Sequence, residues 1–483
     1  MTRSAVVHDL IFDVEADFAM PDVAAALAGE ARVERSTVGL RSAYLDTAER
    51  ALLRAQMTLR RRTGVTDLGW QLKVRHAPFR REIHVASTDV TVPGELRDLL
   101  LGVARGRPLV QVATVITDRT VARLLDAEGR RLAEIHDDTM HSSASGYVVT
   151  ASSWREVRVE LGDADPELLQ AIAKMLRRAG ARPAVARPTL SRAMSAPGDD
   201  VPTGKRDQDA GGIVGAYIAE QQRVILAGDL ALRSGDDSAI HRTRVATRRL
   251  RSTLRTFATL FQPGSAANLD AELRWFAALL GQVRDRQVLT RRLNGMLGTL
   301  DDSLQLGPVA ARINTELRQE QDEHRRKLEQ EMIAPRYLEL LEKIDEWIAL
   351  PPEAPKARAA TKVIEKLVRG PVRKVRRRLH NANATGDFHL LHGARKAAKR
   401  ARYAAEAAEP VVGRKAAAKT AKRYQRLQDL LGEHQDSLVS ADLLRRLAAK
   451  AGTIPGENGF TFGILYEREQ CNATAARQSA NLL

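Results

Sequence analysis

Two basic segments of the sequence carry residues that could bind an anion. The first is HRTRVATRRLR at 241–251 and the second is HGARKAAKRAR at 392–402. On a helix that advances about 100° per residue, the cations of each segment fall within a sector of about 80°. The first face presents His241, Arg244, Arg248, Arg251 and Arg255, and the second presents His392, Arg395, Lys399 and Arg402 before it ends in Glu406. Such a face indicates a site for a polyanion.

Two further basic rows have helical spacing. They are Arg369, Arg373, Arg376 and His380, and Lys415, Lys419, Lys422 and Arg426. Like-charged neighbours cost an isolated helix about 0.2–0.5 kcal/mol per pair. One alternative is that each row is a solvated face with Glu partners from neighbouring helices. The repetition of the rows favours a repeated contact with a polyanion, beside which a histidine would be held protonated.

The basic segments belong to an internal repeat. Shifting the sequence by 151 positions superposes His241 on His392 and Arg248 on Lys399. The same shift superposes LGQVRDRQV at 280 on LGEHQDSLV at 431, matching Leu, Gly, Asp and Val. Two separate segments that share one offset predict a duplicated helical unit, most simply two antiparallel bundles packed side by side.

Charged residues also alternate along predicted strands near the N-terminus. Arg60 and Arg62 share a strand face, and Glu156, Arg158 and Glu160 share another. Charges at every second position need water, a ligand or each other. The pattern therefore leaves two interpretations open: an exposed sheet face, or a hydrated barrel interior that holds a phosphorylated ligand and a divalent cation.

The elements that carry these residues fall into separate domains. Residues 1–195 contain short alternating runs typical of antiparallel strands, whereas residues 212–483 have helical periodicity. The segment 196–211 is rich in Pro, Gly and Asp and is predicted to be a linker. We therefore expect an α+β domain followed by an all-α domain.

Composition restricts the class of partner. A net charge of +16 indicates an anionic partner, while 4% aromatic residues weaken the case for nucleic acid without excluding it. The single cysteine, Cys471, excludes an internal disulfide and a cysteine zinc cluster, and favours the cytoplasm. With no apolar run long enough to span a bilayer, a membrane role is not expected. Oligomeric state cannot be read from the sequence.

The basic segments, with LGQVRDRQVL between them, resemble the CHAD domain, a conserved-histidine α-helical module, over about residues 212–480. The resemblance implies two pseudo-symmetric four-helix bundles that bind inorganic polyphosphate along a basic groove. The residues expected to bind it are His241, Arg244, Arg248, Arg251, Arg255, Arg373, Arg376, His392, Arg395, Lys399, Arg402, Lys419 and Lys422. Arginine and lysine without aromatic residues suit such a polymer, which offers no bases for stacking.

The segments DVEADF, LRRRTG, GWQLKV, TDRTVARLL, LAEIHDD and WREVRVEL resemble the CYTH domain, the triphosphate tunnel metalloenzyme family. The resemblance implies an eight-stranded antiparallel tunnel barrel that binds triphosphate together with Mg²⁺ or Mn²⁺. Phosphate contacts would come from Arg60, Arg62, Lys73, Arg80 and Arg119, and metal ligands from Asp13, Glu15, Glu134, Asp138, Glu156 and Glu160. The catalytic set would be Glu15, Arg60, Arg62 and Lys73, which would support metal-dependent transfer of a phosphoryl group to water.

The sequence departs from the family pattern at two positions. Asp17 stands where the opening motif has lysine, and Arg158 stands where close relatives have glutamate. One hypothesis is that the two side chains approach each other and exchange roles. The alternative is a degenerate site, which would leave a polyphosphate scaffold without catalysis. An enzyme acting on nucleotide or thiamine triphosphate, or an adenylate cyclase, is a further alternative.

Overall fold

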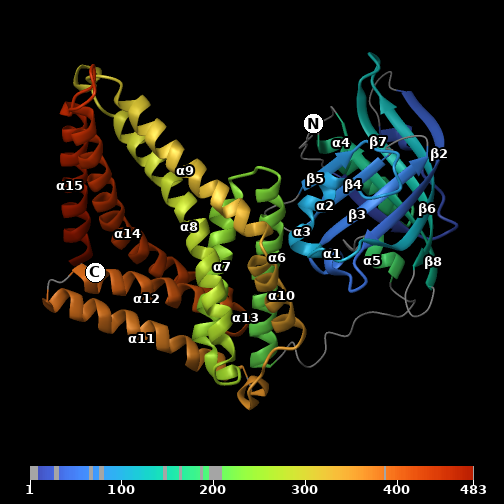
Figure 1. Cartoon of the computed structure of the whole chain (residues 1–483). Coiled ribbons are helices and arrows are strands. Elements are labelled where there is room, and N and C mark those ends of the chain that lie inside the picture. The colour runs from blue at the N-terminus through green and yellow to red at the C-terminus, as the bar shows by residue number, and fades with distance from the viewer. Residues whose placement is uncertain are drawn as a thin grey trace. The chain divides into compact units, whose positions relative to one another are not determined.

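The computed structural model divides into two compact units, Met1–Pro202 and Thr203–Leu483. The boundary falls inside the predicted linker 196–211. Strands dominate the first unit and helices the second, as Figure 1 shows. The residues that the structure describes are 9–26, 32–64, 69–75, 81–144, 150–162, 166–184, 189–194, 209–359, 361–385 and 388–481.

The first unit is built on one antiparallel sheet, as the alternating runs predict. Its strands are β1 (Asp9–Val14), β2 (Arg32–Asp46), β3 (Met57–Gly64), β4 (Gly69–Val74), β5 (Arg81–Val85), β6 (Val110–Leu125), β7 (Arg131–Ala144), β8 (Thr150–Leu161) and β9 (Arg182–Pro183). They lie in the order β5-β4-β3-β2-β6-β7-β8-β1-β9. The predicted barrel had eight strands and a closed sheet. The structure adds the two-residue β9, and among the described strands the edges β5 and β9 do not pair with each other.

The apolar side chains on one face of this sheet pack against α4 (Pro166–Arg178). Leu169, Ile172 and Leu176, spaced at i, i+3 and i+7, place one apolar stripe of the helix in the core. The stripe packs on alternate residues of β1, β7 and β8, including Val157 and Val159. The residues between them are therefore directed to the opposite face of the sheet.

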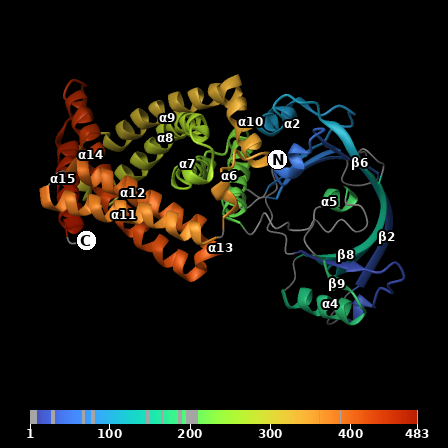
Figure 2. The same cartoon turned by 90° about the horizontal axis from the view of Figure 1, so that it is seen from below.

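The opposite face carries α5 (Thr189–Met194). Leu190 and Ala193 of this helix pack against Tyr44, Val115 and Met140. Figure 2 shows α5 inside the curve of the sheet, so we call this side the concave face. The remaining short helices of the unit are η1 (Val23–Ala26), α1 (Ala51–Arg54), α2 (Gly94–Leu99) and α3 (Leu101–Ala104).

The second unit consists of helices that repeat with the predicted offset. They are α6 (Ala210–Arg233), α7 (Ala239–Thr256), α8 (Ser265–Leu297), α9 (Val309–Ile333), α10 (Pro335–Ala349), α11 (Lys362–Thr385), α12 (Phe388–Ala407), α13 (Glu409–Val412), α14 (Arg414–Ala451) and α15 (Phe460–Asn481), with short helices η3 (Ala258–Leu260), η4 (Asp302–Leu304) and η5 (Pro355–Arg358). Shifted by 151, α6, α7, α8 and α9 fall on α11, α12, α14 and α15. The duplicated four-helix unit is thus confirmed, with α10 and α13 as additions.

Small residues bring the helices of the second repeat close together. Ala394, Ala397, Ala398 and Ala401 of α12 are buried against α11 and α14. Helix α12 also packs on α7 of the first repeat, so the two basic helices lie against each other. Within the described residues, no helix combines the length and the hydropathy that crossing a membrane requires.

Candidate functional site

The strand register gathers the predicted acidic residues of the first unit on the concave face. Paired residues of antiparallel strands point to the same side, and side chains alternate along each strand. One row of paired residues crosses β6, β7, β8 and β1 and consists of Arg119, Asp138, Glu156 and Asp13. Four residues along β7, Glu134 pairs with Glu160 and therefore lies on the same face.

The predicted basic residues share this face. Arg119 pairs with Val38 of β2, and Tyr44, an even number of residues further along that strand, pairs with Arg60 of β3. Alternation along β3 and β4 then adds Arg62 and Lys73. Arg80 lies outside the described residues. The concave face thus collects the described phosphate-binding candidates, which are Arg60, Arg62, Lys73 and Arg119.

At the β3–β5 end, two of these cations already have polar partners. Arg60 Nε donates to Gln71 Oε1 at 2.7 Å, and Lys73 Nζ lies 2.9 Å from a carboxylate oxygen of Glu82. Burial lowers the pKa of Lys73, the charge of Arg60 lowers it further, and Arg158 of β8 adds a smaller effect. Strand β8 lies five strands from β4 in the sheet, so this effect agrees with the curvature of the sheet in Figure 2.

At the β6–β8 end, cations also neutralise the acids. Arg119 donates two hydrogen bonds of 2.7 Å to Asp138, whose side chain is fully buried. His136 lies 2.6 Å from Glu134, and Arg123 donates to the same carboxylate at 3.0 Å. The bond with His136 is the main reason why the pKa of Glu134 falls to about 2, although burial opposes it.

The remaining predicted acids of β1 and its following turn are paired as well. Asp13 pairs with Arg192 of α5, whose guanidinium lies 5.2 Å from the ring centroid of Trp154. Glu15 pairs with Arg182, and both side chains are largely exposed. Arg192 was not predicted as part of the site. Its contribution depends on α5 folding back onto the sheet, for which the sequence carries no local signal.

Glu156 is the acid of this row with the weakest neutralisation. Its oxygen lies 3.9 Å from the guanidinium of Arg158, beyond hydrogen-bond distance. Burial raises the pKa of Glu156, and the charge of Asp138 adds to the rise, while Arg158 and Arg192 oppose it. An acid in this position would gain from a further positive charge.

The predicted metal site does not fit the arrangement of these residues. Carboxylate oxygens are the correct donors for Mg²⁺ or Mn²⁺, which need several ligands converging at about 2.1 Å. Arg119 holds Asp138 and Arg192 holds Asp13, so both carboxylates are already engaged by cations. Within the described part of the chain, no group of three or more His, Cys, Asp or Glu side chains could hold a metal ion.

The predicted exchange between Asp17 and Arg158 is wrong. Register pairs Arg158 with Ile11, six residues before Asp17. Strand β1 ends at Val14, and Asp17 is exposed in the turn that follows. The chain turns after Glu15, and the carbonyl oxygens of Ala16 and Phe18 accept hydrogen bonds from Arg155, which lies on the other face of β8 from Arg158.

In the helical unit, acids neutralise the C-terminal part of each predicted basic face. Arg251 Nε lies 3.2 Å from Asp270 of α8, and Arg255 pairs with the same carboxylate. In the second repeat, Arg402 Nε lies 2.9 Å from Glu406. These three cations of the predicted polyphosphate-binding set are therefore engaged within the fold.

The middle of the two basic faces is different, because cations meet there with little acid between them. We call Arg244, Arg248, Arg395 and Lys399 the crossing cluster, since α7 and α12 pack together at this point. Among the described residues, the one ion pair of the cluster joins Arg244 to Asp285 at 3.6 Å. The pKa of Lys399 is lowered to about 6, mainly by burial and also by the charges of Arg248, Arg395 and Arg244.

His241 extends the crossing cluster toward α8. Burial lowers its pKa, and the charges of Arg284, Arg244, Arg248 and Arg291 add to the effect. Arg284 and Arg291 were not predicted as site residues. Both lie on α8, seven residues apart and therefore on the same face of the helix. Arg284 falls inside the repeated LGQVRDRQV segment, so the repeat could have identified it.

The other predicted polyphosphate-binding residues lie outside the cluster. His392 is exposed near the start of α12. Arg373 and Arg376 are exposed on α11, and Lys419 and Lys422 are exposed on α14. They add positive charge to the surface of the second repeat, whereas the residues of the crossing cluster are half-buried.

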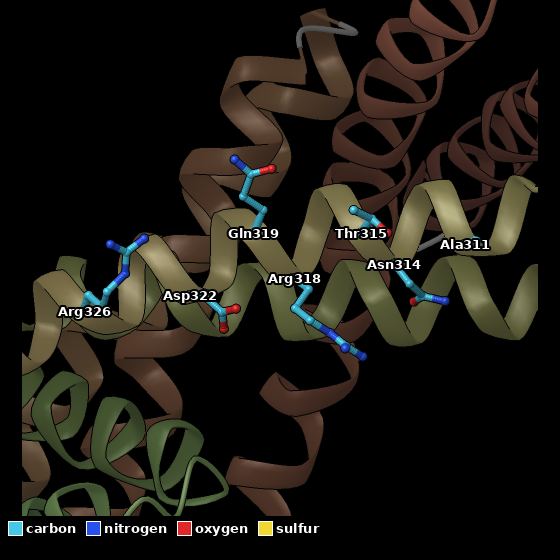
Figure 3. A pocket seen from close by; sticks show the side chains of 7 residues that line it. All are labelled: Ala311, Asn314, Thr315, Arg318, Gln319, Asp322 and Arg326. Atoms are coloured by element: carbon cyan, nitrogen blue, oxygen red, sulfur yellow. The ribbon is translucent and has the colours of Figure 1, made fainter. Parts of the chain in front are cut away.

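A separate surface cavity of about 520 Å³ lies along α9 (Figure 3). Its lining residues are Ala311, Asn314, Thr315, Arg318, Gln319, Asp322 and Arg326, all from this helix. Figure 3 shows these side chains along the ribbon of α9, with Asp322 between the two arginines. None of the predicted site residues contributes to it.

The chain has relatives that share its organisation. The CYTH domain family matches residues 21–184, and the CHAD domain family matches residues 216–445. Two uncharacterized Mycobacterium tuberculosis proteins, one from strain CDC 1551 and one from strain H37Rv, are each 34% identical over 475 residues, which cover 94% of this chain and 90% of theirs.

Solved structures resemble each half. PptA from Streptomyces chartreusis covers 56% of this chain and 99% of its own at 21% identity, with a TM-score of 0.47. The CHAD domain of Ricinus communis covers 57% of this chain and 94% of its own at 23% identity, with a TM-score of 0.47. The Hippeastrum protein HpAC1, described as having a dominant triphosphatase activity, covers 38% of this chain and 92% of its own at 16% identity, with a TM-score of 0.25.

Proposed function

The chain belongs to the proteins that join a CYTH domain to a CHAD domain, and on this basis we propose that it binds inorganic polyphosphate at the crossing cluster. The observation that carries the proposal is the packing of Arg244, Arg248, Arg395 and Lys399 at the contact of α7 and α12. Burying like charges together is unfavourable. A polyanion would supply the negative charge that the fold leaves out.

The chemistry of the cluster suits a chain of phosphates. Each internal phosphate carries about one negative charge, and guanidinium groups can bind two phosphate oxygens at once. The two repeats bring equivalent cations from both sides, so a linear chain can contact α7 and α12 together. Exposed cations on α11 and α14, including Arg373 and Lys419, would extend the contact as a polybasic surface.

The concave face of the sheet is proposed to bind triphosphate or the end of a polyphosphate chain. Its cations include Arg60, Lys73 and Arg119, and the charge of Arg158 reaches the same space. Since the acids do not converge on a metal position, we derive no hydrolytic step from this arrangement. A binder joined to this face would raise the local concentration of chain ends.

Binding of the full-length chain to long-chain polyphosphate tests the proposal. The variant Arg244→Ala with Arg395→Ala removes two charges from the crossing cluster. The matched control, Arg445→Ala with Arg446→Ala, removes the same charge from the exposed surface of α14, where both arginines pair with Asp442. We expect at least about tenfold weaker binding in the first variant and less than about a twofold change in the control.

Competition separates this function from nonspecific nucleic-acid binding. Polyphosphate and duplex DNA are added at matched phosphate concentration, and displacement of labelled polyphosphate is measured. Equal displacement by DNA, or equal losses in the two arginine variants, would refute a dedicated polyphosphate site. Phosphate release from tripolyphosphate, with Mg²⁺ or Mn²⁺ present, measures whether the sheet unit also hydrolyses its ligand.

A further inference from the structure

Two glycines occupy equivalent positions beneath the crossing cluster. Gly281 of α8 and Gly432 of α14 differ by the repeat offset of 151 and are both buried. A Cβ atom added at Gly281 would lie 3.3 Å from the guanidinium nitrogens of Arg244. A Cβ atom added at Gly432 would lie 3.1 Å from Nη2 of Arg395. In each repeat, an arginine of the cluster therefore lies directly over a glycine.

The contacts show that each glycine makes room for an arginine and not for another helix backbone. The three nearest atoms to the added Cβ all belong to Arg244 in one repeat and to Arg395 in the other. The Nε atoms of both arginines are buried and have no hydrogen-bond partner. This arrangement presses one edge of each guanidinium against a helix and gives up a hydrogen bond to do so.

An acid completes each set at the same offset. Asp285 lies 3.6 Å from Arg244, and Asp436 occupies the equivalent position on α14. The charge of Arg395 acts on Asp436, although burial has the larger effect and raises the pKa of this carboxyl. Each repeat therefore has an arginine, a glycine and an aspartate at equivalent positions.

Glycine has a cost at these positions. Inside a helix it is about 1 kcal/mol less favourable than alanine, because the unfolded chain has more freedom to lose. Both positions lie well inside long helices, where no turn or cap calls for glycine. Two glycines that each lower helix stability, and that lie under equivalent arginines, indicate a role other than helix formation.

We propose that Gly281 and Gly432 are positioning residues, which let one edge of Arg244 and of Arg395 lie against α8 and α14 so that the opposite edges meet the phosphates. The inference rests on the proposed function, because it assigns the glycines to the same polyanion site. A methyl group at either position displaces the guanidinium by a few tenths of an ångström, which costs the fold little because the arginine end is flexible. Ligand geometry is less tolerant of such a shift.

Alanine substitutions test the roles of the two glycines in the full-length chain with long-chain polyphosphate. We expect Gly281→Ala and Gly432→Ala each to weaken binding about threefold to tenfold, while the unfolding temperature stays equal or rises. Gly295→Ala is the matched control, since this glycine also lies in α8 and its added Cβ would meet nothing within 4 Å. It should raise the unfolding temperature and leave the affinity unchanged.

A double-mutant cycle separates positioning from a structural effect. Lysine at 395 has no guanidinium edge to lie against the glycine, so Gly432→Ala in an Arg395→Lys background should weaken binding less than about twofold. A penalty that persists at full size in the lysine background overturns the inference. Wild-type affinity in Gly432→Ala overturns it as well. If the wild-type chain does not bind polyphosphate, the proposed function fails and the inference fails with it.

Discussion

The concave face of the sheet and the crossing cluster both collect cations, but they balance charge in opposite ways. On the concave face, Arg119 is matched by Asp138 and Lys73 by Glu82. At the crossing cluster, the half-buried side chains of Arg248 and Lys399 lie near each other, and no acid of the described residues is in ion-pair contact with either. The first face is stable without a ligand and must break ion pairs to bind one. At the crossing cluster, neighbouring cations repel one another, and a bound anion would relieve this repulsion.

Removing the cations that lack acidic partners should have the largest effect on binding. Arg248→Ala combined with Lys399→Ala should weaken long-chain polyphosphate binding about 100-fold or more, since each lost charged contact is worth about 1.5–3 kcal/mol. Arg60→Ala combined with Lys73→Ala on the concave face should change the same affinity less than about twofold. Isothermal titration of the full-length variants measures both. Equal losses would show that the two regions bind the polymer alike.

Binding at the crossing cluster should depend on pH through Lys399. The pKa of Lys399 is about 6 in the free protein, against an ordinary value of 10.5, and bound phosphates would hold it protonated. Binding then takes up a proton between these two pH values, so affinity should fall up to about tenfold per pH unit as the pH rises from about 6.5 to about 8.5. Asp436 is the acid that acts on Lys399 from α14.

Lys399→Arg provides the control for this pH dependence. Arginine stays protonated throughout the range and restores the symmetry with Arg248, so the slope should flatten while binding persists. His241 contributes at the acidic end, because its pKa is also lowered, and His241→Gln removes that part. A slope that Lys399→Arg leaves unchanged would show that Lys399 does not take up the proton.

On the concave face, the free energy of unfolding should fall as the pH is lowered, whereas polyphosphate affinity at the crossing cluster should fall as the pH is raised. The pKa of Glu134 is lowered to about 2 from 4.5, so this carboxylate stabilises the fold above about pH 4.5 and loses the effect as the pH falls toward 2. Glu134→Gln should lower the free energy of unfolding by about 1–2 kcal/mol near neutral pH, after allowance for partial exposure. Denaturant unfolding near pH 7 measures the effect, which should shrink near pH 3 because the carboxyl is protonated in the unfolded chain at that pH.

The sequence predicted how the helices of the second unit repeat, but not which of their cations are neutralised by acids. The offset of 151 predicts which helices correspond because it is a property of the chain itself. Which cations remain unneutralised depends on packing: Asp270, fifteen residues after Arg255, is brought to it when α8 turns back along α7. The same limit applies in the sheet, where Arg192 reaches Asp13 from a helix that lies far along the chain.

A smaller effect on polyphosphate affinity is expected at the end of α7, where acid-neutralised cations follow the crossing cluster in the same helix. Asp270 neutralises Arg251 and Arg255 at the end of α7, beyond the crossing cluster. Asp270→Asn keeps the shape of the side chain and releases both cations, so polyphosphate affinity should rise about twofold to threefold at low salt. Titrations at two salt concentrations measure this gain, which should shrink as salt rises. Unchanged affinity at low salt would mean that the polymer does not extend past the cluster, because released cations would otherwise attract it.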